Sequence, residues 1–155
     1  MSAGEVLVPV AEKSALAAMM QDYIAEMAQI IPGVRVGQPY PQFDLYWTEP
    51  ESRWPFWLIV DGINAGFALV SRDVPTGLVE MEEFFVVRGH RHHGIGMAAA
   101  RRLIGRYPGP WTITQRETNT GAIAFWHRVL DGFVRYDETT TRSDAVRREQ
   151  RFIFP

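Results

Sequence analysis

The residues best suited to chemistry form a basic, glycine-containing loop, Arg91-His92-His93-Gly94-Ile95-Gly96. Apolar residues before it predict a strand, and the pattern after it predicts a helix that begins near Gly96. The first N–H groups of a helix have no partner within the helix and carry a partial positive charge, so they favour anions. Glycine allows close approach of the backbone to a phosphate, and basic side chains add charge-assisted hydrogen bonds. The loop therefore predicts a site for a ligand that carries a pyrophosphate.

Two familiar phosphate motifs compete for this loop. A Walker loop needs Gly-Lys followed by Ser or Thr, and the loop lacks that combination. A dinucleotide fingerprint fits better, since Gly94-x-Gly96-x-x-Ala99 matches it and Glu117 follows roughly 20 residues later. That fingerprint, however, belongs directly after the first strand of a βαβ unit. Here polar residues intervene, and the preceding strand is the fourth in the expected order.

The elements that must position the loop follow from apolar periodicity and turn signals. Asp61-Gly62 between two apolar runs predicts a hairpin, and Asn119 or Thr120 is expected to cap a helix that ends at Leu130. The expected order is β-α-β-β-β-α-β-α-β-β, a mixed sheet with helices on its faces and thus an α/β or α+β domain. Strands are expected over 5–10, 56–60, 63–70, 78–87, 111–115, 133–139 and 149–154, and helices over 12–30, 96–107 and 119–130.

Composition narrows the class of protein. The 155 residues fit one domain, and an apolar content of 46% is enough to form a core. A net charge of -2 gives no support for a nucleic-acid partner, and no apolar run is long enough to span a bilayer. There is no cysteine, and the histidines lack zinc-like spacing, so no metal site is predicted. The N-terminus lacks the features of a secretion signal, and we expect a cytoplasmic protein.

Three segments together indicate a family. Arg91-x-x-Gly94-x-Gly96 resembles the acyl-CoA loop of the GNAT superfamily of N-acetyltransferases, whose pattern is Gln/Arg-x-x-Gly-x-Gly/Ala. The strand end before the loop resembles the fourth strand of that family. The segment with Asn119, Ala122, Phe125-Trp126 and Gly132-Phe133 resembles its Asn-x-x-Ala-x-x-Phe-Tyr…Gly-Phe segment. The resemblance implies a GNAT fold and acetyl-CoA as cosubstrate, and it covers roughly 78–133.

The resemblance also implies which residues contact the cosubstrate. The backbone of Phe84, Phe85 and Val86 would pair with the pantetheine arm, and the loop amides of His92 to Met97 would hold the pyrophosphate. Asn119 would hydrogen-bond the cosubstrate, with the following helix beside the thioester. The implied cosubstrate-binding residues are Phe84, Phe85, Val86, Arg91, His92, His93, Gly94, Ile95, Gly96, Met97, Asn119, Phe125 and Trp126.

Direct attack of an amine on the acetyl thioester needs a base for the amine, and a fourth-strand N–H is a candidate donor to the oxyanion. The candidate bases are Glu80, Glu82 and Glu83. In a regular strand, Glu80 and Glu82 share one face and Glu83 points to the other. Glu80 suits the spacing of a histone-type base. Glu83 is favoured narrowly, since Glu83-Phe84-Phe85-Val86 resembles a signature of a bacterial subgroup of the superfamily.

One position departs from the family pattern. Many members have a tyrosine as the acid for the departing thiolate, and this sequence has Trp126. An indole N–H donates a hydrogen bond but no proton at useful pH, so the thiolate would leave unprotonated or take its proton from water, the amine or a residue such as His127. The same departure supports the alternative function, a non-catalytic module that binds an acyl-CoA as a sensor or interaction domain.

The acceptor is expected over the fourth strand, beside the first helix and the aromatic segment that follows it. Tyr40, Tyr46 and Trp47 are the candidate substrate-binding residues, because aromatic rings and nearby acids suit a cationic amine. A primary amine of a small molecule or peptide is the expected partner, without nucleic acid or membrane, for a monomer or homodimer.

Overall fold

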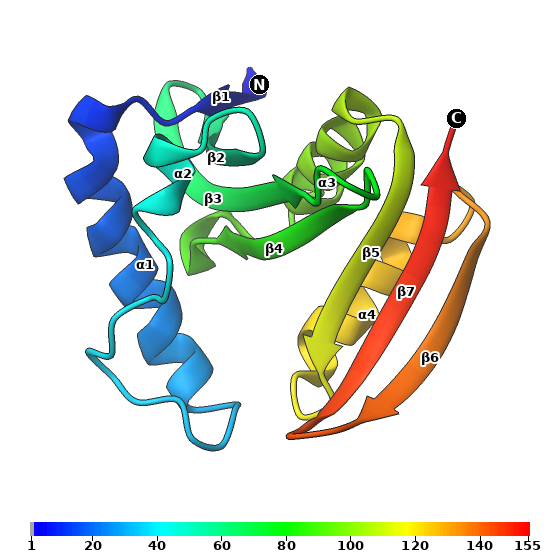
Figure 1. The fold of residues 1–155 in the computed structure, drawn as a ribbon. Coiled ribbons are helices and arrows are strands. Elements are labelled where there is room, and N and C mark those ends of the chain that lie inside the picture. Colours follow the sequence, from blue (N-terminus) through cyan, green and yellow to red (C-terminus); the bar gives the residue numbers. More distant parts are fainter. Residues whose placement is uncertain (1) are drawn as a thin grey trace.

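The computed structural model describes residues 2–155, which form one seven-stranded sheet with helices on both faces (Figure 1). The predicted order of strands and long helices is confirmed; a short helix and two 3-10 turns are additional. The strands are β1 (Ala3–Leu7), β2 (Arg53–Val60), β3 (Ile63–Arg72), β4 (Val79–Val86), β5 (Gly109–Arg116), β6 (Tyr136–Arg142) and β7 (Val146–Phe154). The helices are α1 (Lys13–Ala28), α2 (Leu45–Thr48), α3 (Ile95–Arg106) and α4 (Thr120–Leu130), and the 3-10 turns are η1 (Val10–Glu12) and η2 (Arg88–His90).

The sheet divides into two antiparallel halves that meet at one parallel pair. Its order is β1-β2-β3-β4-β5-β7-β6, and β4 and β5 are parallel neighbours. Their pairing is short, since it joins Val79 to Trp111, Glu80 to Thr112 and Met81 to Ile113 and then ends. Beyond Met81 and Ile113 the two strands continue without pairing to each other. Backbone groups of β4 that face β5 are therefore left free for other partners.

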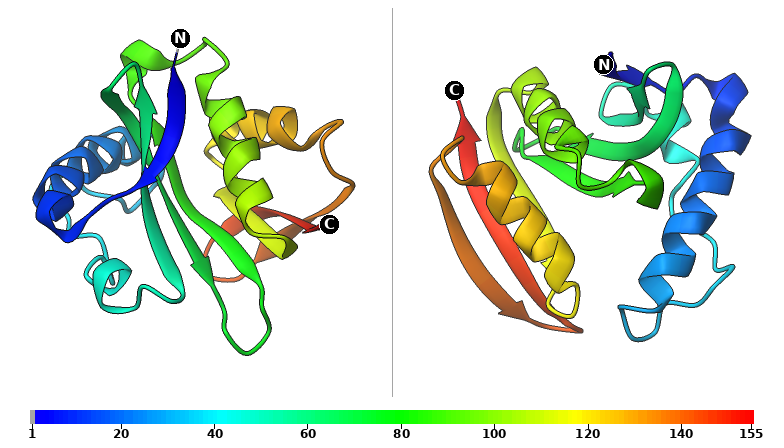
Figure 2. Two further views of the ribbon diagram at one scale, coloured as in Figure 1. Left: turned by 90° about the horizontal axis from the view of Figure 1, so that it is seen from above. Right: turned by 180° about the vertical axis from the view of Figure 1, so that it is seen from behind.

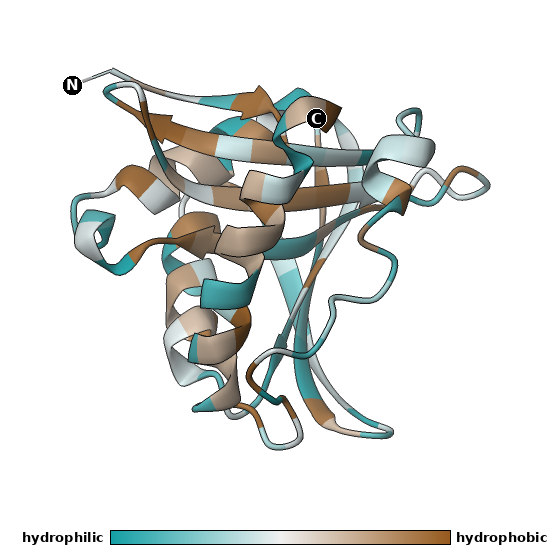
Figure 3. Cartoon of the chain, turned by 90° about the vertical axis from the view of Figure 1, so that its left-hand side faces the viewer, coloured by the Kyte–Doolittle hydropathy of each residue, from teal (hydrophilic) through white to brown (hydrophobic). Residues whose placement is uncertain are grey.

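Two clusters of buried side chains cover the two faces of the sheet. One cluster lies under α3 and α4 and includes Leu103, Trp111 and Leu130. The other joins Leu16 and Met20 of α1 to strand residues of β2, β3 and β4. Viewed from behind, α3 and α4 lie together on one face and α1 lies apart from them (Figure 2). Hydrophobic stretches run along several of the strands (Figure 3).

Local backbone signals explain why the elements meet where they do. Asp61 and Gly62 both have positive φ, 49° and 78°, as the predicted two-residue hairpin turn requires. Asn119 caps α4, because its side-chain oxygen accepts a hydrogen bond of 3.1 Å from the Ala122 N–H. No helix in residues 2–155 has the length and apolar character needed to cross a membrane.

Candidate functional site

A cavity of about 820 Å³ opens where β4 and β5 separate. One wall comes from the second half of α1, the opposite wall from the end of β5 and the start of α4, and the rest from β4 and the basic loop. The α1 wall carries Tyr23, Glu26 and Met27, with Ile30 and Ile31 just beyond it. Sequence-predicted residues that line the cavity are Glu82, Glu83, Phe84, Phe85, Val86, Arg91, His92, Gly94, Gly96, Met97, Asn119, Phe125 and Trp126.

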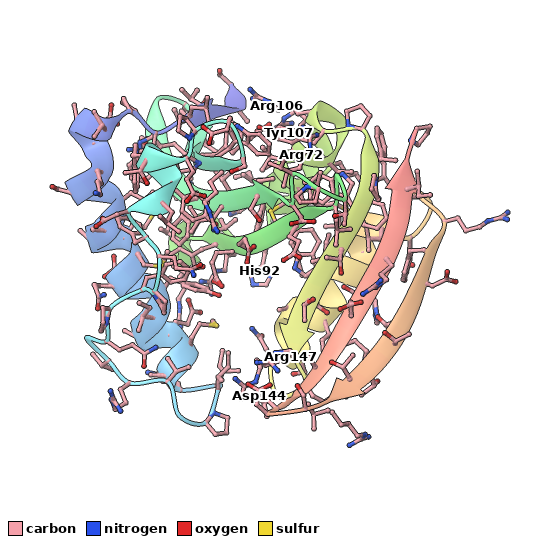
Figure 4. All side chains as sticks on the ribbon, in the orientation of Figure 1. Arg72, His92, Arg106, Tyr107, Asp144 and Arg147 are labelled. Atoms are coloured by element: carbon pink, nitrogen blue, oxygen red, sulfur yellow. The ribbon has the colours of Figure 1, made fainter. Side chains whose placement is uncertain are left out.

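The basic loop has the geometry of an anion site. Gly94 occupies the N-cap position of α3 in a left-handed conformation, with φ 74°, and its carbonyl accepts from the Ala98 N–H. His92 also has positive φ, 66°, and it lines the cavity (Figure 4). Gly96 is needed for packing, since a Cβ there would lie 3.1 Å from the Phe125 ring. The first amides of α3 thus begin at the cavity, whereas His93 and Ile95 are not among its lining residues.

A β-bulge alters which faces the glutamates occupy. The register between β3 and β4 pairs Leu69 with Glu83 and Val70 with Met81, so Glu82 is an extra residue. The strict alternation expected for Glu80, Glu82 and Glu83 therefore does not hold. Glu83 lies on the α1 face, close enough to Tyr23 for the two groups to shift each other's pKa.

Glu83 is the carboxylate with the most unusual environment. Burial raises its pKa to about 8; the Tyr23 hydroxyl partly offsets this effect, and the charge of Glu82 adds to it. Its Oε2 atom is buried and has no hydrogen-bond partner within residues 2–155. Burial, and then the charge of Glu83, raise the pKa of Tyr23 well above its ordinary value, so this hydroxyl stays protonated. The pair can therefore hold or accept a proton at the cavity wall near neutral pH.

The other two glutamates differ from Glu83. Burial raises the pKa of Glu80 to about 7, and the nearby Glu82 adds to the rise, but Glu80 does not line the cavity. Glu82 does line it and is exposed, with Oε1 accepting a hydrogen bond of 2.7 Å from the Ser71 hydroxyl.

The aromatic residues predicted to bind the acceptor do not line this cavity. Tyr46 is 3% exposed and packs in the core beneath α1, and the Trp47 indole N–H donates to the Val8 carbonyl. Tyr40 packs against the same cluster but lies near Glu83, whose charge contributes, after burial, to the raised pKa of this tyrosine. The cavity wall on this side is instead formed by Tyr23, Met27 and residues that follow α1.

The region around Trp126 is built from aromatic rings. Trp126 is 5% exposed and contacts Phe84 and Phe125 with ring centroids 5.4 and 5.0 Å away. His127 does not line the cavity; its Nε2 lies 2.6 Å from Glu138 Oε1 on the outer part of the sheet. A proton from His127 therefore has no direct path into the cavity.

Comparison with known proteins places this geometry in a family. The model of the acetyltransferase (GNAT) family matches residues 17–131, which is most of the chain and includes every residue that lines the cavity. This chain belongs to the acetyltransferase (GNAT) family. The predicted superfamily is thereby confirmed, and with it the class of enzyme, an N-acetyltransferase. No curated protein sequence matches the chain significantly.

Solved structures of similar fold agree with this acetyltransferase over nearly its full length. A ribosomal L7/L12 alpha-N-protein acetyltransferase, RimL, in complex with coenzyme A superposes with a TM-score of 0.78 at 9% identity, covering 99% of this chain and 95% of that one. A GNAT acetyltransferase from Streptococcus agalactiae gives 0.76 at 14% identity, covering 99% and 96%. The protein yncA of Salmonella typhimurium, a putative acetyltransferase with acetyl-CoA, gives 0.70 at 13% identity, covering 99% and 94%. These identities establish the shared fold, and the predicted fold class is confirmed.

Arg91 of the acetyltransferase connects the loop to α1. Its Nη1 and Nη2 donate to the two oxygens of Glu26 at 2.7 and 2.6 Å, and its Nε donates to the Val86 carbonyl at 2.7 Å. The two bonds to Glu26 hold the pKa of this carboxylate below its ordinary value. The sequence motif suggested a phosphate contact for this side chain; the structure shows a tether between α1 and the end of β4.

We expect Arg91→Met to lower the free energy of unfolding by about 1–3 kcal/mol, because it leaves a partly buried carboxylate without its partners. Urea unfolding measures this change. Arg91→Lys should recover little, since an ammonium cannot make the paired bonds. In a double-mutant cycle with Glu26→Gln, the two effects should be strongly less than additive, and full additivity would contradict the tether.

Two groups of cavity residues were not predicted from the sequence. Tyr23 and Met27 belong to the apolar stripe of α1, and Ile30 continues that spacing just beyond the helix; the pattern indicates only that they face inward. Gln115 follows Trp111 and Ile113 at alternate positions of β5 and so faces the same side of the sheet. A polar side chain at a core-facing position would have indicated a candidate site residue.

Proposed function

We propose that this acetyltransferase moves the acetyl group of acetyl-CoA to a primary amine of a small molecule or peptide by direct attack. The observation that supports it best is Glu83, a base with a raised pKa and a buried, unpartnered oxygen, on the bulged strand that borders the cavity. Similar folds are known with coenzyme A or acetyl-CoA bound, as in RimL and yncA. The cosubstrate expected from the sequence is thus the one that proteins of this fold bind.

The proposed arrangement gives α3 and β4 separate tasks. The first amides of α3, from Gly94 to Met97, face the pyrophosphate, and unpaired β4 backbone beyond Met81 faces the pantetheine arm. A β4 N–H in this stretch stabilises the oxyanion that forms when the amine adds to the thioester carbonyl. Asn119 stays the cap of α4; its Nδ2 donates one N–H to Met27 Sδ at 3.6 Å and offers the other at the cavity wall.

Glu83 removes a proton from the attacking ammonium, directly or through water. A pKa of about 8 lets it bind the proton more readily than an ordinary carboxylate while remaining partly ionised at neutral pH. The C–N bond forms, the tetrahedral intermediate collapses, and the C–S bond breaks to release the thiolate of coenzyme A. The nitrogen of the intermediate loses its second proton as the amide forms. Because Trp126 supplies no proton, the thiolate takes that second proton, directly or through water, or leaves as such while the proton passes to water.

The acceptor enters along the α1 wall in this proposal. Met27, Ile30 and Ile31 form an apolar surface there, and Glu82 and Glu83 contribute negative charge beside it. An amine that is cationic before deprotonation and carries an apolar group fits both features. This assignment replaces Tyr46 and Trp47, whose side chains are committed to the core, as the expected acceptor contacts.

The alternative is an acyl-CoA-binding module without turnover, and Trp126 at the position of the usual tyrosine favours it. Purified protein is mixed with acetyl-CoA and a panel of small amines and peptides, and release of free thiol is followed. Amine-dependent release supports the transferase. Thermal stabilisation by acetyl-CoA without turnover on the whole panel supports the module, and stabilisation by NAD but not by coenzyme A contradicts both.

A further inference from the structure

Two glutamine side chains are buried next to each other on the sheet face that α4 covers. Gln150 of β7 is 0% exposed and Gln115 of β5 is 5% exposed. A buried amide is unfavourable unless it is hydrogen-bonded, and each of these donates to the other. The distance from Gln115 Nε2 to Gln150 Oε1 is 2.7 Å, and that from Gln150 Nε2 to Gln115 Oε1 is 2.9 Å.

The orientation of this amide pair is fixed from outside by Glu138. The Glu138 carboxylate accepts from Gln150 Nε2 at 2.7 Å, from Arg148 at 3.3 Å, and lies 2.6 Å from His127 Nε2. Burial acts to raise the pKa of Glu138, but the hydrogen bonds from Gln150 and His127 outweigh it and lower this pKa. An ionised carboxylate only accepts, so Gln150 must turn its NH₂ group toward it. That choice in turn fixes which atoms of Gln115 face Gln150.

Gln115 has one N–H donor left for a ligand. An amide NH₂ group has two N–H donors. Gln150 uses both, one on Glu138 and one on Gln115. Gln115 uses one on Gln150, and within residues 2–155 no second acceptor for its Nε2 is found. Gln115 lines the cavity, so its remaining N–H is available there.

The position of Gln115 along β5 indicates which part of a ligand it meets. β4 and β5 separate after Met81 and Ile113, and Gln115 is two residues beyond that point, as Glu83 is on β4. Gln115 therefore borders the cavity at about the level of Glu83, and Trp126 lines the same cavity. An N–H donor at this level suits a carbonyl oxygen, and the thioester end of acetyl-CoA carries such oxygens.

We propose that Gln115 donates its free N–H to a carbonyl oxygen at the thioester end of the pantetheine arm, with Gln150 and Glu138 as positioning residues. This inference rests on the proposed function, in which acetyl-CoA occupies the cavity. It adds a side-chain contact from β5 to the backbone contacts of β4, and it gives the polar chain that runs from His127 at the surface to the buried Gln115 a role in orienting the cosubstrate.

The test compares two probes by isothermal titration calorimetry. Acetyl-CoA contains the pantetheine arm, whereas adenosine 3′,5′-bisphosphate carries only the nucleotide end. The variant Gln115→Met/Gln150→Leu replaces both amides by apolar groups of similar size, so that neither is left unpaired. It should bind acetyl-CoA roughly fivefold to tenfold more weakly than the wild type, as expected for one lost hydrogen bond, and bind the bisphosphate equally well.

Other outcomes are equally informative. Equal affinity of the variant and the wild type for acetyl-CoA overturns the role of Gln115, and so does an equal loss for both probes, which would indicate general distortion. A wild type that binds no acetyl-CoA counts against the proposed function itself. If the variant does not fold, the side-chain amide of Gln115 is followed by NMR in the wild type. Its proton signals should shift with acetyl-CoA but not with the bisphosphate, and unchanged signals with acetyl-CoA would overturn the proposal.

Discussion

Replacing Glu83 by glutamine is expected to lower kcat/KM for the amine by roughly 10²- to 10⁴-fold, the usual contribution of a general base. Glutamine has nearly the same shape but cannot accept the proton. Glu83 lies at the bulge of β4, and its buried Oε2 has no partner within residues 2–155 whose loss would disturb the fold. Steady-state kinetics with an amine from the panel gives the size of the loss, and calorimetry should show unchanged affinity for acetyl-CoA.

The same substitution should remove a pH dependence. With a pKa of about 8 for Glu83, kcat/KM of the wild type should rise as the pH approaches 8 and then level off, because the base must be ionised. The folded state prefers protonated Glu83, so its contribution to stability is complete below the ordinary value of 4.5 and is lost as the pH rises through 8. Glu83→Gln should therefore flatten both the activity profile and the decline in stability between these limits.

Glu80→Gln is the matched control, because Glu80 is on the same strand but does not line the cavity. Because the pKa of Glu80 is raised to about 7, Glu80→Gln should alter the pH dependence of stability. It should leave kcat/KM nearly unchanged. Glu82→Gln tests the remaining candidate. A larger loss of activity in either variant than in Glu83→Gln would assign the base to that residue.

Gly66→Ala should lower the free energy of unfolding by about 3 kcal/mol or more, at the upper end for overpacked sites. An added Cβ at Gly66 would lie 2.0 Å from the Phe85 carbonyl oxygen and 3.0 Å from Val86 Cα. These are backbone atoms of β4, so no side-chain rotation can relieve the contact, and β3 and β4 must move apart. Urea or thermal unfolding measures the loss, and any folded fraction should bind acetyl-CoA weakly because Phe85 and Val86 line the cavity.

Gly4→Ala provides the comparison for Gly66→Ala. Gly4 is also in a strand, β1, but a Cβ there would have no atom within 4 Å. This variant should be as stable as the wild type or slightly more stable, because alanine restricts the unfolded chain. Equal effects of the two substitutions would show that the close approach of β3 to β4 does not restrict which residue is tolerated at position 66.

Short-range patterns were enough to predict the elements of this protein. The Asp61-Gly62 turn, the Asn119 cap and the apolar alternation of the strands depend on neighbours within a few residues, and each was found where expected. Boundaries shifted where the signal was weak. The strand expected over 133–139 is β6, Tyr136–Arg142, because residue 133 ends the turn after α4 and 134–135 have no regular structure. Within the aromatic segment over 34–55, a short α2 was not anticipated.

The sequence could not predict the roles that depend on residues far away in the chain. Arg91 is 65 residues from Glu26, and the loop motif gives no sign that α1 delivers a carboxylate to it. Tyr40, Tyr46 and Trp47 suit a binding surface as well as a core, and the packing of 34–48 against α1 and β2 decides between these roles. Gln115 and Gln150 are paired across β5 and β7, 35 residues apart.

Residue types at fixed local spacing were enough to identify the family and the order of the elements, and they predict a phosphate-binding loop. Only the folded chain shows that Glu82 and Glu83 line the cavity, that Glu80 does not, and that Glu83 is the buried one. A single extra residue at the β4 bulge turns Glu83 toward Tyr23, and the register that creates it arises only when β3 and β4 pair. Burial in that position, and no feature of the local sequence, raises the pKa of Glu83 to about 8.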